Sequence, residues 1–312
     1  MSRDEDLESR LDPQLREIFR VLPPIAIGRE VVQRERVELS DALREVERPP
    51  GFSDRFIPGL EHDPLVRLRS YRPPAASGRL PALIWLHGGG WTLGVPEVDE
   101  RMLQEFADQV ALQIVSVDYR LAPEHPFPAA LRDAEAALRW TFEHSAELQV
   151  DPEQLFVGGS SAGANLAAGL CVKLRDGAQP NPAFQLLLYP ALDDRLDTPS
   201  MHEIADRRTI HREFLRDCWR SYLGSAVPNP YSSPARAEEL SGLAPALIIA
   251  AELDPLRDEA VRHAVRLWQA AVRCELHVLQ GAIHGVDALA RTSALARLVT
   301  GLARDGLSRA LR

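Results

Sequence analysis

Short apolar runs that alternate with longer helical patterns most limit how this chain of 312 residues can fold. Strands are predicted at residues 65–71, 82–86, 114–117, 155–157, 184–189, 246–250 and 275–279, and helices near 129–146, 162–176, 256–272 and 286–311. Strands that alternate with helices indicate βαβ units and a mostly parallel sheet, and right-handed crossovers put helices on both of its faces. We therefore predict an α/β fold.

Two stretches break this alternation. Residues 1 to about 50 are helical in pattern, with a second helix expected from Ile25 to Val46 and an earlier one whose apolar residues are Leu7, Leu11, Leu15 and Ile18. Residues of about 198–235 are polar and helical, then rich in Pro, Ser and Asn. We expect the two stretches to form a cap over one end of the sheet, within a single domain of residues 1–312.

Charge and composition exclude several classes of partner. The formal net charge of −9 disfavours nucleic acid and anionic membrane surfaces, which both need a basic footprint. No apolar run approaches the length of a membrane span, and no apolar segment follows the acidic N-terminus. The three cysteines are widely spaced and indicate free thiols in a reducing compartment. We therefore expect a cytoplasmic protein.

A G-x-S-x-G motif at Gly159–Gly163 follows the predicted strand 155–157 and precedes a predicted helix. This strand–turn–helix context is what a nucleophile elbow requires, because the glycines permit a tight turn that exposes the serine hydroxyl. The motif predicts Ser161 as the nucleophile. A nucleophile at Ser160 would put Ala162 at the last glycine position.

Three consecutive glycines, in His87–Trp91, follow the predicted strand 82–86 directly. Their backbone N–H groups are not shielded by side chains and can stabilise a developing oxyanion. A flexible turn is the alternative interpretation, which the flanking His87 and Trp91 make less attractive.

An aspartate and a histidine lie at the ends of the last two predicted strands. Asp254 follows strand 246–250 and His284 follows strand 275–279, at the carboxyl edge where open α/β sheets bind ligands. The order Ser161, Asp254, His284 is that of an α/β-hydrolase triad. In such a triad His284 is the general base and Asp254 orients it. Asp258 is the competing carboxylate, one helical turn further on.

These motifs, together with the segment Val117–Ala130, resemble the hormone-sensitive-lipase-like (bacterial family IV) esterases of the α/β-hydrolase fold. The resemblance runs from about Pro81 to Val286. It implies a carboxylesterase with a helical cap that acts on small-molecule esters of short to medium acyl chains, with no metal and no other cofactor. It also implies oxyanion donors at Gly89, Gly90 and Ala162, with Gly88 as a less favoured alternative, and a homodimer paired through strand 275–279.

The chain departs from the family pattern at three places. Ser160 stands where an aspartate is common, Ala164 replaces a frequent glycine, and Val98–Glu100 lacks a common histidine. These departures bear on loop hydrogen bonding and substrate range.

Other functions stay open at this point. An amidase, peptidase or lactonase could use the same triad, although a peptidase usually needs a further gating domain. Haloalkane or epoxide chemistry needs a carboxylate where Ser161 stands. A binding module that has lost catalysis would be expected to have a damaged triad.

Overall fold

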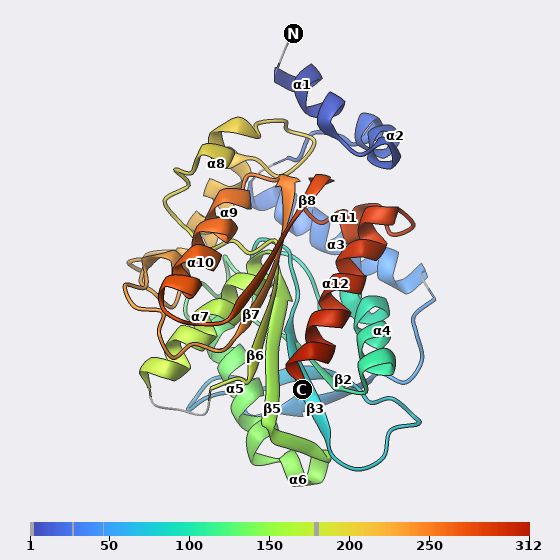
Figure 1. Cartoon of the computed structure of the whole chain (residues 1–312), viewed down its shortest axis with the longest axis vertical. Coiled ribbons are helices and arrows are strands. Elements are labelled where there is room, and N and C mark those ends of the chain that lie inside the picture. Colours follow the sequence, from blue (N-terminus) through green and yellow to red (C-terminus); the bar gives the residue numbers. More distant parts are fainter. Residues whose placement is uncertain (1–2, 27, 46, 178–180) are drawn as a thin grey trace.

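An eight-stranded sheet forms the centre of the protein, whose computed structural model describes residues 3–26, 28–45, 47–177 and 181–312 (Figure 1). The strands lie in the order β1-β2-β4-β3-β5-β6-β7-β8. Strands β3 to β8 are parallel, whereas β1 and β2 pair antiparallel at one edge. The strands are β1 Ser53–Ile57, β2 Val66–Tyr71, β3 Leu80–Leu86, β4 Gln113–Asp118, β5 Val150–Ser160, β6 Phe184–Leu188, β7 Ala246–Leu253 and β8 Cys274–Ile283.

Helices cover both faces of the sheet, so the expected α/β-hydrolase architecture is confirmed (Figure 1). One face carries α5 (Ala129–Glu143), α7 (Ala162–Asp176) and α10 (Arg257–Gln269), and the other carries α4 (Glu100–Val110) and α12 (Ala294–Ala310). Alternate residues of β3 face the two sides, so Ile84 and Leu86 belong to one buried cluster and Leu83 and Trp85 to the other. Short helices α6 (Ser145–Leu148) and α11 (Val286–Leu289) complete this part of the fold.

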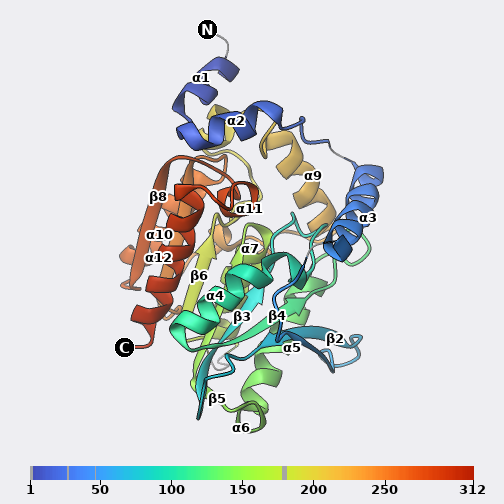
Figure 2. The ribbon, with the colours of Figure 1, turned by 90° about the vertical axis from the view of Figure 1, so that its right-hand side faces the viewer.

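The remaining helices gather at the end of the sheet toward which the parallel strands point (Figure 2). They are α1 (Arg3–Arg10), α2 (Pro13–Val21), α3 (Arg29–Glu45), α8 (Pro199–Glu203) and α9 (Arg212–Leu223). Leu11, Leu15 and Phe19 are buried, so α2 and the turn before it pack against the body of the protein. The described residues do not include Met1, Ser2, Ile27 and Val46. The last two belong to the helix expected from Ile25 to Val46.

All seven predicted strands are present, but β1 and α4 were not predicted, and a single helix was predicted in places where there are two. The helix expected to carry Leu7, Leu11, Leu15 and Ile18 is divided into α1 and α2, because Pro13 begins a new helix and the Asp12 side chain caps it by accepting the Gln14 N–H. Residues 286–311 form α11 and α12, and the side chain of Ser293 caps α12 by accepting a hydrogen bond from the Ala296 N–H. Four of the five β1 residues are exposed, so this edge strand has no alternating apolar pattern. In the described part of the chain, no helix is long and apolar enough to cross a bilayer.

Candidate active site

A sharp turn between β5 and α7 presents Ser161 at the carboxyl edge of the sheet. Ser161 has φ 55° and ψ −116°, a conformation that a non-glycine residue adopts only where its surroundings impose it. A Cβ on Gly159 would lie 2.5 Å from the Leu86 carbonyl oxygen, and one on Gly163 would overlap the same oxygen. Both glycines of the motif are therefore required, because β3, β5 and α7 approach each other here without room for side chains.

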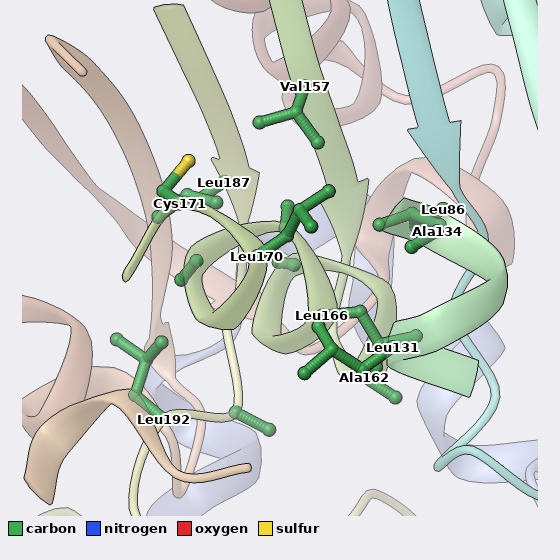
Figure 3. Packing of buried hydrophobic residues seen from close by; sticks show 14 of the residues in the cluster. Leu86, Leu131, Ala134, Val157, Ala162, Leu166, Leu170, Cys171, Leu187 and Leu192 are labelled. Carbon is green, nitrogen blue, oxygen red and sulfur yellow. The ribbon is translucent and has the colours of Figure 1, made fainter. Parts of the chain in front are cut away.

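The core on one side of the sheet holds α7 in place. Leu166 and Leu170 of α7 pack close to Leu131 and Ala134 of α5 and to Val157 of β5 (Figure 3). Ser161 is also fixed through its backbone, because its N–H donates to the Leu188 carbonyl at 2.7 Å. The serine hydroxyl is thus carried by a rigid element.

The structure brings the three predicted triad residues together. His284 Nε2 lies 2.9 Å from Ser161 Oγ, and His284 Nδ1 lies 2.7 Å from Asp254 Oδ2. A carboxylate can only accept, so Nδ1 carries the imidazole proton and Nε2 is free to accept the serine proton. Asp254 is 1% exposed and its other oxygen accepts the Leu256 N–H at 2.9 Å, which orients the carboxylate.

The competing carboxylate, Asp258, is engaged elsewhere. It lies inside α10, where Oδ2 accepts the N–H of Ser200 at 2.7 Å and Oδ1 accepts from the Arg257 guanidinium at 2.8 Å. These contacts lower the pKa of Asp258 below its usual value, against the opposing effect of partial burial. Asp258 thus ties α10 to α8, and Asp254 alone of the two bonds to His284.

The glycine loop lies directly against the nucleophile elbow. A Cβ on Gly88 would be 3.0 Å from Ser160 Oγ and 3.7 Å from the Cβ of Ser161. Gly89 and Gly90 have φ values of 120° and 59°, which favour glycine. None of the described residues accepts a hydrogen bond from the N–H of Gly89, Gly90 or Ala162. These three donors remain available to an oxyanion, and Ala162 lies at the positive end of the α7 dipole.

The His87 side chain stabilises the glycine loop through a hydrogen bond. Its Nδ1 is 2.7 Å from the Gly88 carbonyl oxygen, which can only accept, so Nδ1 carries the proton. Complete burial lowers the pKa of His87 to about 4, so the ring is neutral at pH 7. Tyr119 stacks on this ring with centroids 4.2 Å apart and donates from its hydroxyl to the His87 carbonyl at 2.8 Å. Through Tyr119, the segment Val117–Ala130 therefore acts as a scaffold behind the loop.

A cavity of about 830 Å³ opens beside His284 and Gly285. This volume is within the range that accommodates small organic ligands. Its wall is mainly apolar and comes from the α2–α3 connection, α3, α9, the end of the glycine loop and α11: Leu22, Pro23, Pro24, Ile25, Val31, Val32, Leu93, Ile210, Phe214, Ala288 and Leu289. Charged residues lie among them at Arg34, Glu35, Arg208, Asp217 and Arg220.

Two residues that surround the predicted triad were not predicted to belong to the site. Tyr189 lies edge-on to the His284 ring and donates its hydroxyl to Asp287 at 2.7 Å. Glu259 of α10 is buried and accepts the Leu192 N–H at 2.5 Å in the loop that follows β6. Burial raises the pKa of this carboxyl well above its usual value. No role was predicted for either residue, because the partners of both are distant in sequence.

Comparison with known proteins agrees with this fold. Residues 83–288 match a family model described as alpha/beta hydrolase fold. The carboxylesterase NlhH of Mycobacterium tuberculosis is 38% identical over 283 residues, which cover 88% of this chain and 85% of that protein. An ethyl acetate hydrolase of Pseudomonas putida is 32% identical over 296 residues, covering 91% and 92% of the two chains.

Solved structures give the same result. A bacterial heroin esterase superimposes with a TM-score of 0.91 at 37% sequence identity, over 97% of this chain and 99% of that one. Esterase LipW of Mycobacterium marinum has a TM-score of 0.90 at 37% identity and covers 97% of each chain. The chain therefore belongs to the hormone-sensitive-lipase-like, family IV carboxylesterases of the α/β-hydrolase fold.

Proposed function

We propose that this carboxylesterase hydrolyses short- to medium-chain esters through a triad of Ser161, His284 and Asp254 and an acyl-enzyme intermediate. The observation that carries the proposal is the position of the His284 imidazole, 2.9 Å from Ser161 Oγ and 2.7 Å from Asp254 Oδ2. Such a bridge is what a serine needs, because its hydroxyl is a weak nucleophile at neutral pH without an adjacent base.

Acylation begins when Ser161 Oγ attacks the ester carbonyl and His284 Nε2 takes the serine proton. The carbonyl oxygen becomes an oxyanion, which the N–H groups of Gly89, Gly90 and Ala162 stabilise. The tetrahedral intermediate collapses, and His284 delivers the proton to the leaving alcohol oxygen. Asp254 stabilises the imidazolium that exists between these two proton transfers.

Deacylation repeats the sequence with water as the nucleophile. His284 takes a proton from water as it attacks the acyl carbonyl, and then returns a proton to Ser161 Oγ as the carboxylic acid leaves. The same three N–H groups face the oxyanion in both half-reactions, so their orientation matters twice per turnover.

The substrate site is proposed to be the cavity beside His284, with a cap built from about 1–50 and about 198–235. Support comes from its lining, which combines Ile25 and Val32 from the first stretch with Ile210 and Phe214 from the second. The mainly apolar wall favours an ester with apolar substituents.

A series of p-nitrophenyl esters from acetate to palmitate tests the activity and the chain-length preference together. Wild type should turn over most rapidly on the shorter chains, and Ser161→Ala should lose almost all turnover, since removal of such a serine costs roughly 10⁶-fold in a studied protease. Ser160→Ala is the matched control and should stay active. Activity retained by Ser161→Ala would contradict the triad, and a folded wild type without activity would favour an amidase or lactonase.

We also propose that two copies pair through β8. Among the residues that the structure describes, this strand is last in the sheet and pairs with β7 alone, and Val278 on it is 42% exposed. An open strand edge is a template for pairing with another chain. Sedimentation at micromolar concentration should show a dimer that Val278→Arg weakens. A wild-type monomer under these conditions would exclude this pairing.

The three cysteines, Cys171, Cys218 and Cys274, are all free thiols. Free thiols persist in a reducing compartment, and on this basis we propose that the enzyme acts in the cytoplasm. Cell fractionation with an antibody to the protein tests this, and recovery outside the cytoplasmic fraction would contradict it.

A further inference from the structure

The orientation of the Gly90 N–H depends on what holds the opposite side of the same peptide group. The Gly89 carbonyl and the Gly90 N–H belong to one planar trans peptide, so they point in opposite directions. The Gly89 oxygen accepts the N–H of Thr92 at 3.0 Å and that of Leu93 at 2.8 Å. These two bonds aim the Gly90 N–H away from the turn.

A second peptide group continues this connection. The Leu93 N–H, which bonds to the Gly89 oxygen, shares its plane with the Thr92 carbonyl. The Thr92 oxygen accepts a hydrogen bond from Arg36 Nε at 2.8 Å. Two rigid peptide planes thus join the Arg36 guanidinium to the Gly90 N–H.

Arg36 belongs to α3, and the Thr92 carbonyl that it contacts is 56 positions away in the sequence. Its Nη2 donates to the Ala122 carbonyl at 2.7 Å and to Glu124 Oε2 at 3.0 Å. Ala122 in turn donates its N–H to the Trp91 carbonyl at 2.9 Å. The guanidinium is therefore held between the glycine loop and the scaffold segment, and its side chain is only 27% exposed.

We propose that Arg36 is a positioning residue that holds the oxyanion donor at Gly90 through the Thr92–Leu93 peptide. This inference rests on the proposed acyl-transfer function of the same site. Arginine suits the role because its planar fork can donate to two carbonyl oxygens at fixed angles, and bonds from a charged donor are stronger than neutral ones. Helix α3 then contributes to transition-state stabilisation as well as to the wall of the substrate cavity.

If Arg36 orients the Gly90 N–H, its loss should change the kinetics differently than if Arg36 only holds α3 on the body of the protein. An oxyanion exists only in the transition state and the tetrahedral intermediates, so a misaligned donor lowers kcat and leaves KM nearly unchanged. If Arg36 served only to dock α3 on the body, its loss would lower thermal stability or raise KM, because α3 lines the cavity.

The variant Arg36→Met tests the proposal, because it keeps an apolar stem and removes every donor. With a short p-nitrophenyl ester its kcat should fall about tenfold, less than the 10²–10³ lost when an oxyanion donor is removed outright. Its KM should stay within about twofold of wild type. Arg44→Met is the matched control: Arg44 lies on the same helix, is 76% exposed and bonds to Asp41, and its kcat should match wild type.

Two further measurements separate the possible outcomes. A boronic acid that forms a tetrahedral adduct with the serine should bind Arg36→Met more weakly by about the same factor as kcat falls. Arg36→Lys keeps the charge and should recover part of the lost kcat, which covers the case in which Arg36→Met does not fold. A wild-type kcat in Arg36→Met and Arg36→Lys, or a rise in KM alone, would overturn the proposal. Absence of serine-dependent turnover in wild type would instead overturn the proposed function, and this inference with it.

Discussion

Ser161 has an unfavourable backbone conformation because three elements meet around it. Its φ of 55° is imposed by the turn from β5 into α7, and its N–H and carbonyl are both held, by Leu188 and by Asn165 and Ala191. Strain of this kind costs of order 1–3 kcal/mol and persists only where the surroundings over-determine it. Here it exposes the hydroxyl to His284 Nε2.

Replacement of Asp254 should lower turnover far more than replacement of Asp258, which lies one helical turn further on. We expect Asp254→Asn to lower kcat by about 10⁴, because an amide at this position favours the wrong tautomer of the histidine. Asp258→Asn should leave kcat within about threefold, because this side chain bonds to Ser200 and Arg257 instead of His284. Steady-state kinetics on one p-nitrophenyl ester distinguishes the two. Equal losses in both variants would remove the distinct role proposed for Asp254.

The sequence can predict the place of single site residues where they follow a recognisable strand or motif. Asp254 and His284 stand at strand ends, so their meeting at one edge of the sheet follows from the topology of a parallel sheet. The contact between Arg36 and the Thr92 carbonyl joins residues 56 positions apart through a backbone atom. It could not be predicted, because no side-chain pattern records which carbonyl a guanidinium will reach.

At the scale of elements, the elbow is a crossing of β3, β5 and α7 that only glycines allow. A Cβ on Gly163 would overlap the Leu86 carbonyl oxygen and lie 2.5 Å from that of His87. Both oxygens belong to backbone at the end of a central strand and cannot move away as a side chain could.

Gly163→Ala should therefore lower the free energy of unfolding by about 3 kcal/mol or more, as severe overpacking does. Gly301→Ala in α12 is the control, because its Cβ would meet only Arg304 Nη2 at 4.0 Å. That variant should be more stable than wild type by about 0.5–1 kcal/mol, the usual gain of alanine over glycine in a helix. Urea unfolding of both measures the difference, and similar stabilities would contradict the packing argument.

The elements that sequence reasoning missed were overlooked for different reasons. Strand β1 could not be found from alternation, because only Ile57 of its five residues is buried. Helix α4 does carry the amphipathic signal, with Leu103, Phe106, Ala107 and Val110 buried at helical spacing. The break between α11 and α12 could not be predicted from apolar spacing alone. Ser293, which caps α12, is the one sequence signal for the start of the second helix.

At the scale of the whole molecule, a buried histidine makes stability depend on pH. Neither ring nitrogen of His263 in α10 has a hydrogen-bond partner among the residues that the structure describes. Burial, aided by the Arg266 charge, lowers the pKa of His263 to about 4. In the unfolded chain a histidine has a pKa of about 6.5. Between these two values the unfolded state binds the proton and the native state does not.

The stabilisation from a neutral His263 is therefore complete above about pH 6.5 and is lost as the pH falls toward about 4. We expect His263→Leu to lessen the acid dependence of the unfolding free energy by about 1.4 kcal/mol per pH unit in this window. Urea unfolding of wild type and variant at pH 7 and pH 5 provides the comparison. Parallel pH profiles would show that His263 does not titrate as its burial implies.

The overall architecture could be predicted because alternation, motif order and strand-end positions all indicate the same fold. The shape of the cavity beside His284 could not, because it depends on how residues 22–26, residues 28–32 and α9 come together there. Apolar residues in such cap segments have no motif, and their contacts join parts of the chain that are far apart.

We propose that Ser161 is the nucleophile, and covalent labelling with a fluorophosphonate can identify the reactive serine. This reagent traps the activated serine of a serine hydrolase, and peptide mapping by mass spectrometry identifies the modified residue. We predict one label per chain, on Ser161, that appears as ester hydrolysis disappears and does not form in Ser161→Ala. A label on Ser160 or elsewhere, or complete loss of activity without a label on Ser161, would contradict the claim.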